Sequence, residues 1–385
     1  MDLIHFICTL GIFTLFNVIA ISESEKLQCM DEDNKPVDWF ILYKLPTSEK
    51  PKGSTDESYG KKYLYMSSST IRSPGWKTPK KLISDPDSMP GNTLKPLYAT
   101  GRSGQIWVLY NDQPPSEAKV KGTCGHSKGV VAANREGGFW MVHSVPKFPD
   151  GPSKGQYSYP ESGSNNGQTF LCITMGSQEI EKVAAQLQMN EVGLYYNFYD
   201  ESLVTVYPKL VSIAQGTAYK LDTDQSKVDI KTVANNVFTS FAKSRKFSKD
   251  LYEDLVAPSL LTSMSVETWR NGAGSPLPSD CSTAYKVMNV ENVNLCVKKD
   301  CDSFSYTKDH SKWAVSIDDQ KPYICIGDVN RALSQGKRGG GTVCMNNAKV
   351  WKAFYSAVTD VEPCPRPRPL AKTPSLKKSP SVNLV

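Results

Sequence analysis

The chain has 385 residues, of which 39% are hydrophobic and 22% are charged. That composition excludes a disordered chain, a collagen-like repeat and a protein with many membrane spans, and the length allows two or three ordinary domains or one large two-lobed unit. The formal net charge is +6, and residues 364–385 contribute five basic side chains and no acidic one. The rest of the chain is close to neutral, so a local cluster of cations would have to bind any anionic ligand.

Residues 1–22 have the features of a secretory signal peptide. Leu3–Ala20 is a mostly apolar run, and Ala20 and Ser22 are the small residues expected before a cleavage site that follows Ser22. The run has 18 residues and no Lys or Arg before it, so an uncleaved membrane anchor is the alternative. No basic segment follows the run, which favours cleavage and a mature protein that is not attached to a membrane.

The ten cysteines indicate an exported chain, because disulfides persist outside the reducing cytosol. Cys8 would leave with the signal peptide, and the nine that remain are an odd number, so one thiol is free or pairs between chains. No Cys or His spacing is typical of a zinc site, and we expect neither a metal ion nor another cofactor. The sequence has no Asn-x-Ser/Thr sequon, so N-glycosylation is not expected.

Segments rich in β-branched and aromatic residues predict buried strands at Val37–Pro46, Gln105–Asp112 and Gly137–Pro146. Residues 47–104 are polar, and we expect surface loops with short elements there. Helical spacing of apolar residues predicts helices at Ser177–Asn190, with Ser177 as N-cap, and at Val233–Phe247. The proline-rich basic segment 364–385 predicts an extended tail. Alternating strands and helices indicate a layered α/β or α+β architecture.

A short internal sequence repeat is the most informative feature of the chain. Gly125-His126-Ser127-Lys128 in the first half recurs as Asp309-His310-Ser311-Lys312 in the second. An apolar stretch and a turn with glycine follow each copy. Because residues two apart in a strand project from the same face, each His-x-Lys pair would point together. The repeat therefore predicts two related lobes that each offer an imidazole and an ammonium group.

Two imidazoles and two ammonium groups in one pocket suit the cleavage of a phosphodiester. One neutral imidazole attacks phosphorus, and the other, as imidazolium, protonates the leaving oxygen. The lysines stabilise negative charge on the other oxygens, in the role that a divalent metal ion would otherwise fill. Since histidine titrates near about 6.5, and a bound phosphate raises its pKa while lysines lower it, we expect activity to be greatest at mildly acidic pH.

A single His-Ser-Lys tripeptide would carry little information, because it is common by chance. The chain has only four histidines, however, and one of them lies in the signal segment. Two of the other three stand in matching contexts, which favours a functional interpretation over coincidence. We interpret the third, His143, as a strand residue whose ring is satisfied by its neighbours.

Ten motifs, in the same order along the chain, resemble deoxyribonuclease II from Cys29 to Cys364: VDWFILYKLP, LYNDQPP, GHSKGVV, GGFWMVHSVPKFP, GQTFLC, SFAKSRKF, DLYEDLVAP, TKDHSKWAV, CIGDVNR and RGGGTVC. The resemblance implies an α/β fold, a single-chain pseudodimer of two phospholipase-D-like lobes, each a mixed β-sheet flanked by helices. We expect the lobes at residues 23–205 and 206–363, between the signal peptide and the tail.

The resemblance also implies a secreted or lysosomal acid endonuclease of double-stranded DNA that needs no metal. It would act through a phosphohistidine-type intermediate and leave 3′-phosphate and 5′-hydroxyl ends. The implied catalytic residues are His126, Lys128, His310 and Lys312. Asn330, in a Gly-Asp-x-Asn sequence, resembles the superfamily's phosphate-site asparagine. Asp328 would either orient His310 or stabilise a turn.

Cysteine pairing is implied by the same resemblance, with disulfides Cys29–Cys172, Cys281–Cys364 and Cys325–Cys344. Cys296 and Cys301 would close a small loop of their own. Cys124 is then the unpaired thiol, which either links two chains or stays free at a strand edge. Asn134 departs from the family, which often has Asp there, and this leaves the support of His126 in doubt.

Two other functions compete with the nuclease. The first is a catalytically weak secreted homologue that binds DNA or a host molecule, and the second is a phosphodiesterase of lipid head groups. Both His-Ser-Lys motifs are complete, which favours the enzyme, and the lipid alternative rests on the superfamily resemblance alone. The missing sequons fit secretion better than glycan-directed transport to lysosomes.

Overall fold

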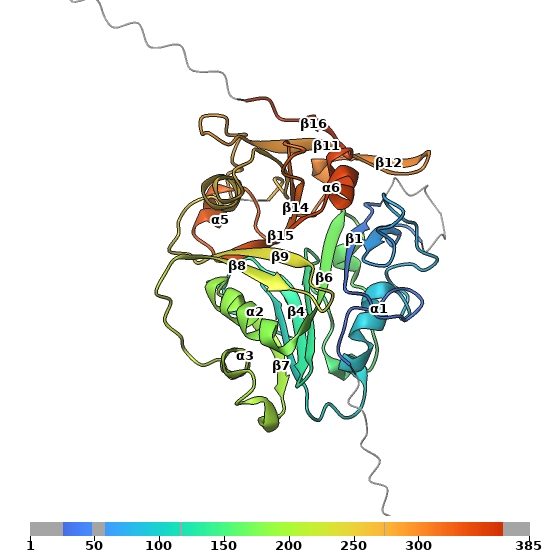
Figure 1. Ribbon diagram of the computed structural model, residues 1–385, viewed down its shortest axis with the longest axis vertical. Helices are drawn as coiled ribbons and strands as arrows, with labels where there is room; N and C mark the ends of the chain where they lie inside the picture. Colours follow the sequence, from blue (N-terminus) through green and yellow to red (C-terminus); the bar gives the residue numbers. More distant parts are fainter. Residues whose placement is uncertain (1–25, 48–57, 116–117, 273, 365–385) are drawn as a thin grey trace, which may run out of the picture.

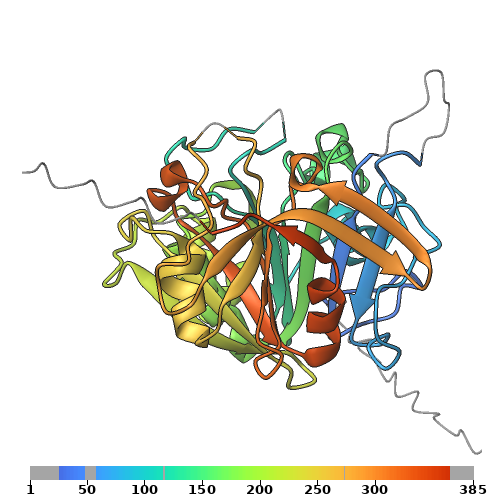
Figure 2. The same cartoon turned by 90° about the horizontal axis from the view of Figure 1, so that it is seen from above.

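The computed structural model describes residues 26–47, 58–115, 118–272 and 274–364. The expected signal peptide and the tail beyond Cys364 lie outside these residues. Within the described part, no helix has both the length and the apolar character that crossing a membrane requires. Two large sheets lie against each other, with helices between them and on their outer sides (Figure 1, and from above in Figure 2).

The first sheet has seven strands in the order β2-β1-β6-β5-β4-β3-β7. Its pairings are antiparallel, so neighbouring strands are joined by turns and loops rather than by crossover helices. The strands are β1 Trp39–Lys44, β2 Tyr63–Ser67, β3 Ile106–Asn111, β4 Lys128–Asn134, β5 Gly137–His143, β6 Gln168–Gly176 and β7 Leu194–Tyr199.

The second sheet has nine strands, eight of them in the order β12-β11-β10-β13-β14-β15-β9-β8, with β16 paired to β11. It is mixed, because β10 and β11 run parallel. A mixed sheet was expected for each lobe, and the first sheet differs, since all its pairings are antiparallel. The strands are β8 Gln225–Lys231, β9 Val237–Lys243, β10 Met264–Glu267, β11 Val287–Val297, β12 Asp300–Ser305, β13 Trp313–Ser316, β14 Tyr323–Gly327, β15 Gly340–Asn346 and β16 Val358–Val361.

The helices are short apart from α2, which packs against strands of both sheets. Their bounds are α1 Met89–Leu94, α2 Ser177–Met189, α3 Pro208–Ala214, α4 Ala257–Leu260, α5 Leu333–Gly336 and α6 Ala348–Tyr355. A π-helical turn, Tyr252–Val256, leads into α4. α3 packs on α2, β3 and β7, and α6 packs on β13 and β14.

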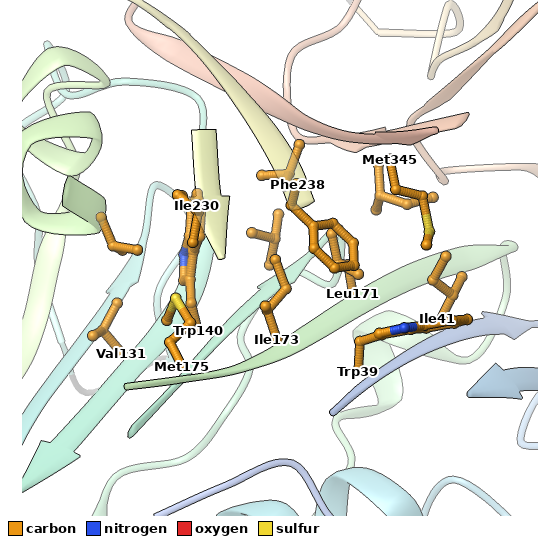
Figure 3. Packing of buried hydrophobic residues seen from close by; sticks show 14 of the residues in the cluster. Trp39, Ile41, Val131, Trp140, Leu171, Ile173, Met175, Ile230, Phe238 and Met345 are labelled. Carbon is orange, nitrogen blue, oxygen red and sulfur yellow. The ribbon is translucent and has the colours of Figure 1, made fainter. Parts of the chain in front are cut away.

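One continuous hydrophobic core joins the two sheets. Figure 3 shows Trp39 and Ile173 of the first sheet opposite Phe238 and Met345 of the second, all in the same buried cluster. Separate clusters cover the outer face of each sheet. Because the inner faces share a core, neither lobe can bury its apolar surface without the other. The lobe boundary placed at residue 205 stays a prediction.

The central strands of the two sheets repeat one arrangement. The order β1-β6-β5-β4-β3 corresponds to β9-β15-β14-β13-β10. The register agrees as well, since Lys44 of β1 is opposite Gln168 and Lys243 of β9 is opposite Gly340, each at the start of the neighbouring strand. This twofold relation confirms the α/β fold class with two related lobes.

Most predicted elements are confirmed, with two corrections. β1, β3 and β5 occupy the three predicted strands, and α2 occupies the first predicted helix, although Ser177 is its first residue and Gly176 its cap. The helix predicted at Val233–Phe247 is wrong, because Val237–Lys243 is β9. β9 lies between β8 and β15 and is buried along much of both faces, which hides the alternation that would have marked a strand.

Residues 58–104 also contribute more to the interior than a set of surface loops would. Their buried apolar side chains include Tyr63, Leu64, Met66, Trp76, Ile83, Met89, Leu94 and Leu97. The four expected disulfides are confirmed: Cys29–Cys172, Cys281–Cys364, Cys296–Cys301 and Cys325–Cys344. Cys124 is the free thiol among the described cysteines, and it is buried.

Candidate active site

The two His-Ser-Lys segments lie at the starts of β4 and β13: Lys128 is the first residue of β4, and Lys312 directly precedes β13. The backbone N–H of His126 donates to the carbonyl of Gly339 at 2.8 Å, and that of His310 donates to the carbonyl of Gly167 at 2.9 Å. Each motif is therefore held by a glycine of the opposite lobe. A side chain at Gly167 would not fit, since its Cβ would lie 2.3 Å from Oδ1 of Asp309.

The first half-site is built around the buried ring of His126. Its Nδ1 lies 2.5 Å from the carbonyl oxygen of Asp328, and its Nε2 lies 4.0 Å from Oδ2 of Asp112. Because a carbonyl only accepts hydrogen bonds, Nδ1 carries a proton and Nε2 is the nitrogen left for chemistry. Asp112 also forms ion pairs with Lys128 and with Arg338, whose Nη2 lies 3.1 Å from Oδ2.

The charges of this half-site are strongly coupled. Burial lowers the pKa of His126 to about 3; Asp112 opposes the shift, and Lys128 and Lys312 add to it. Burial alone would raise the pKa of Asp112, but the neighbouring His126, Lys128 and Arg338 hold it well below its ordinary value. Asp112 is thus an ionised carboxylate inside the site.

The second half-site is built around His310. Its Nδ1 lies 3.2 Å from Oε1 of Gln168 and 3.2 Å from Nζ of Lys312, and its ring centroid lies 5.4 Å from that of Trp269. Nζ of Lys312 also donates to the carbonyl of His310 at 2.6 Å. The neighbouring Asp309 accepts hydrogen bonds from the hydroxyl of Tyr43 and, at 2.9 Å, from the N–H of Ser311.

Electrostatic interactions connect the two half-sites. Burial lowers the pKa of His310 well below its usual value, and Lys312, Lys128 and His126 lower it further. Burial, followed by repulsion from Lys128, likewise lowers the pKa of Lys312. Since these effects act between lobes, the structure brings the two predicted His-Lys pairs, 184 residues apart in the sequence, into one charged cluster.

The supporting residues lie differently from expectation. The backbone carbonyl of Asp328 contacts His126, and no hydrogen bond to His310 is found for Asp328 within the described part of the chain. Its Oδ1 accepts a hydrogen bond from the N–H of Gly341 at 2.9 Å, as in the alternative turn role. Burial raises the pKa of the Asp328 carboxyl to about 7. Asn330 is 9% exposed, and its amide oxygen has no hydrogen-bond partner among the described residues.

Asn134, whose identity raised doubt about His126, is the last residue of β4. Six residues of extended strand separate it from Lys128, a distance of roughly 20 Å. Its carbonyl accepts a hydrogen bond from the Tyr207 hydroxyl at 2.6 Å. Support for His126 comes instead from Asp112 and Asp328.

Sequence reasoning missed four residues of the site: Asp112, Gln168, Trp269 and Arg338. Asp112 ends a predicted strand in LYNDQPP, and Gln168 and Arg338 stand beside the glycines of GQTFLC and RGGGTVC. The sequence did contain a signal for Asp112, Gln168 and Arg338, because each is a charged or amide residue beside the end of a strand. His143 lies buried in β5 against Phe148 and Phe170, as expected for a strand residue. Its ring is satisfied only in part, because Nδ1 accepts from the N–H of Val145 at 3.2 Å while Nε2 has no hydrogen-bond partner among the described residues.

Comparison with known proteins agrees with this geometry. The sequence model of the family described as Deoxyribonuclease II matches residues 28–364. The protein is accordingly an enzyme, a hydrolase that acts on DNA. It belongs to the deoxyribonuclease II family, and the match includes both His-Ser-Lys motifs.

Curated relatives cover nearly the whole chain. Plancitoxin-1 of Acanthaster planci is 38% identical over 354 residues, which are 91% of this chain and 96% of the relative. Deoxyribonuclease-2-alpha of Mus musculus is 37% identical, with 89% of this chain and 94% of the relative covered. Deoxyribonuclease-2 of Caenorhabditis elegans is 34% identical, with 91% and 97% covered.

Proposed function

We propose that this hydrolase is an acid endonuclease that cuts double-stranded DNA without a metal ion. The proposal rests on one observation. In each His-Ser-Lys motif the backbone N–H of the histidine donates a hydrogen bond to a glycine carbonyl of the other lobe, which places both motifs at the junction of the lobes. A phosphodiester between the two imidazoles would have a nucleophile on one side and a proton donor on the other.

The reaction would proceed in two steps. In the first, the lone pair of one imidazole nitrogen forms a bond to phosphorus, the bond from phosphorus to the 5′ oxygen breaks, and the second imidazolium protonates that oxygen. In the second, the now neutral imidazole takes a proton from water, the water oxygen bonds to phosphorus, and the phosphorus–nitrogen bond breaks. The products are a 5′-hydroxyl and a 3′-phosphate, and His126 and His310 regain their starting states.

Lysine and asparagine side chains would stabilise the phosphate during both steps. Lys128 and Lys312 supply positive charge for its free oxygens, and the buried amide of Asn330 supplies a further contact. Asp112 compensates the charge of Lys128 before DNA arrives, so that the site is not a purely cationic cavity.

The acid preference follows from the charges. Burial lowers the pKa of both histidines, and Lys128 and Lys312 lower it further. A bound DNA phosphate adds negative charge and raises both pKa values, which permits one imidazole to be protonated in mild acid. As pH rises through the raised pKa, the proton donor is lost and the rate falls.

The proposed setting is secretion or a lysosome, with double-stranded DNA as the partner. The four disulfides fit either compartment. A disulfide-linked dimer through Cys124 would require exposure of a residue that is 7% exposed, and electrophoresis without reductant tests for it.

Plasmid cleavage in excess EDTA at pH 5 and pH 7.5 tests the proposed activity. We expect nicking and linearisation at pH 5 and little at pH 7.5, with 3′-phosphate ends detected by their resistance to polymerase extension until a phosphatase is added. Retention of plasmid without cutting at either pH would instead indicate a DNA-binding homologue. Cleavage that disappears with EDTA would overturn the metal-independent mechanism.

A further inference from the structure

Two buried lysines occupy equivalent places in the two lobes, and the proposed reaction uses neither. Lys44 is the last residue of β1, and Lys243 is the last residue of β9. Both are fully buried, and both stand opposite the first residue of the neighbouring strand, Gln168 or Gly340. A buried ammonium group is costly unless it is hydrogen-bonded, so these side chains need partners.

Their partners are backbone carbonyls at the ends of short helical turns. Nζ of Lys44 donates to the carbonyl of Ser164 at 2.6 Å, directly after the 3₁₀ turn Glu161–Gly163. Nζ of Lys243 donates to the carbonyls of Gln335 and Gly336 at 3.0 Å, at the end of α5, and to that of Arg338 at 2.6 Å. Carbonyls at the end of a helical turn lack the next turn's N–H donors, although that of Gln335 also accepts from the N–H of Arg338 at 3.1 Å.

Two of these carbonyls lie shortly before the glycines that hold the motifs, that of Ser164 by three residues and that of Arg338 by one. Ser164 precedes Gly167, whose carbonyl accepts from the N–H of His310. Arg338 precedes Gly339, whose carbonyl accepts from the N–H of His126. Each lysine thus fixes a loop of its own lobe, and that loop fixes a histidine of the other.

We propose that Lys44 and Lys243 are positioning residues that act crosswise, Lys44 on His310 and Lys243 on His126. The inference rests on the proposed function for its catalytic consequence, but the positioning itself is a property of the folded protein. It differs from a general contribution to stability because it assigns each lysine to one histidine.

The contacts of Lys243 determine its charge state. Three carbonyls need three N–H donors, which an ammonium group has and a neutral amine lacks. The charged groups that act on Lys243 are Asp250, Glu191 and Asp328, and those that act on Lys44 are Asp309 and Glu161.

Burial lowers the pKa of Lys243 to about 8 and that of Lys44 to about 7, and the nearby carboxylates oppose the shift. Both lysines are therefore protonated in mild acid, and each loses a donor as pH rises through its pKa. For Lys243 the lost donor leaves one of its three carbonyls unpaired, so the loop that holds His126 would loosen in the same direction in which the proposed activity declines. Lys44 has a single carbonyl partner and keeps a donor for it.

Side-chain NMR of the histidines tests the crosswise assignment in the mature protein. Only three histidines remain after removal of the signal segment, and His126→Ala and His310→Ala assign two of the signals. We expect Lys44→Met to shift the His310 signals and leave those of His126, and Lys243→Met to do the reverse. Equal shifts of both histidines in each variant, or shifts of neither, would overturn the proposal.

A milder variant tests the same contact if the lysine variants do not fold. Thr47→Val removes a second donor to the Ser164 carbonyl, at 3.0 Å, without burying a new charge. It should move the His310 signals in the same direction as Lys44→Met but less. Lys182→Met, a partly exposed helix residue, and Tyr157→Phe, a buried hydroxyl bonded to Ile83, are the matched controls and should move neither histidine.

Cleavage kinetics complete the test. Misplacement of a catalytic group by about 1 Å can cost on the order of 100-fold in rate, so kcat should fall about 10- to 100-fold in each lysine variant with KM little changed. Wild-type kcat in both variants would contradict the proposal. If selective NMR shifts occur in a protein that cuts no DNA, the positioning holds and the proposed function fails.

Discussion

The two half-sites share a backbone arrangement and differ in their charges. Each places a His-Ser-Lys segment before a central strand and holds it by a glycine carbonyl from the other lobe. His126, however, faces the ionised carboxylate of Asp112, whereas His310 contacts the amide of Gln168 and the ring of Trp269. In the first half-site Asp112 forms an ion pair with Lys128, whereas among the described residues no carboxylate lies within ion-pair distance of Lys312.

The symmetry of the two sheets thus determines where the two imidazoles lie, while the residues that follow the neighbouring strands determine the charge around each imidazole. Asp112 directly follows β3, and the corresponding stretch after β10 leads instead to Trp269. A repeated fold can therefore give two imidazoles at related positions unequal affinities for a proton. A mechanism that needs one neutral and one charged histidine benefits from that inequality.

Removal of either imidazole should have the largest effect on the rate of DNA cleavage, although the two rings have different neighbours. His126→Ala and His310→Ala should each lower the rate of plasmid cleavage at pH 5 by at least about 1000-fold, because nucleophilic attack and proton donation are both essential. A filter assay should still show DNA retention. His143→Gln is the control and should keep most of the activity; a fully active His310→Ala would exclude a paired site.

Substitutions of Lys128 and Lys312 should differ in their effect on stability more than in their effect on rate. Lys128→Met and Lys312→Met should each lower kcat by about 100- to 1000-fold, because each removes charge stabilisation of the phosphate. Lys128→Met also removes a buried partner of Asp112. Breaking such a pair costs at most about 3–5 kcal/mol here, because Arg338 still pairs with Asp112. Urea unfolding should show a clearly smaller loss for Lys312→Met, and equal losses would contradict the difference in charge compensation.

Asp112→Asn should affect the first half-site more than the second. The pKa of Asp112 is lowered in the folded protein, so its contribution to stability is present above its unfolded pKa of about 3.9 and is lost as pH falls through the folded value. Wild type should thus keep this contribution at pH 5. In Asp112→Asn the free energy of unfolding should fall at both pH 5 and pH 7, and NMR should show a lower pKa for His126 than in wild type.

Asn134→Asp should have the smallest effect. The residue stands at the far end of β4 from His126, so restoring the family's common aspartate should change kcat at pH 5 by less than about twofold. A tenfold increase would show that Asn134 weakens the enzyme through a contact with the first half-site.

Sequence alone predicted the paired motifs, three strands of the first sheet and the longest helix, because these depend on local pattern and on an internal repeat. It did not predict that Asp112 and Arg338 pair within the site, since 226 residues separate them and only the packing of the two sheets brings them together. It left two roles open for Asp328, and only the folded structure shows its carbonyl beside His126 and its carboxylate bound to the N–H of Gly341. A strand buried on both faces, such as β9, has no alternation to distinguish it from a helix.

Binding of a short oligonucleotide with a 3′-phosphate, followed through the histidine signals at pH 5, tests the central claim most directly. If both imidazoles face one phosphorus atom, the signals of His126 and His310 should shift together, with one apparent affinity and one oligonucleotide per chain. Separate affinities for the two histidines, or a response from only one of them, would contradict a shared site.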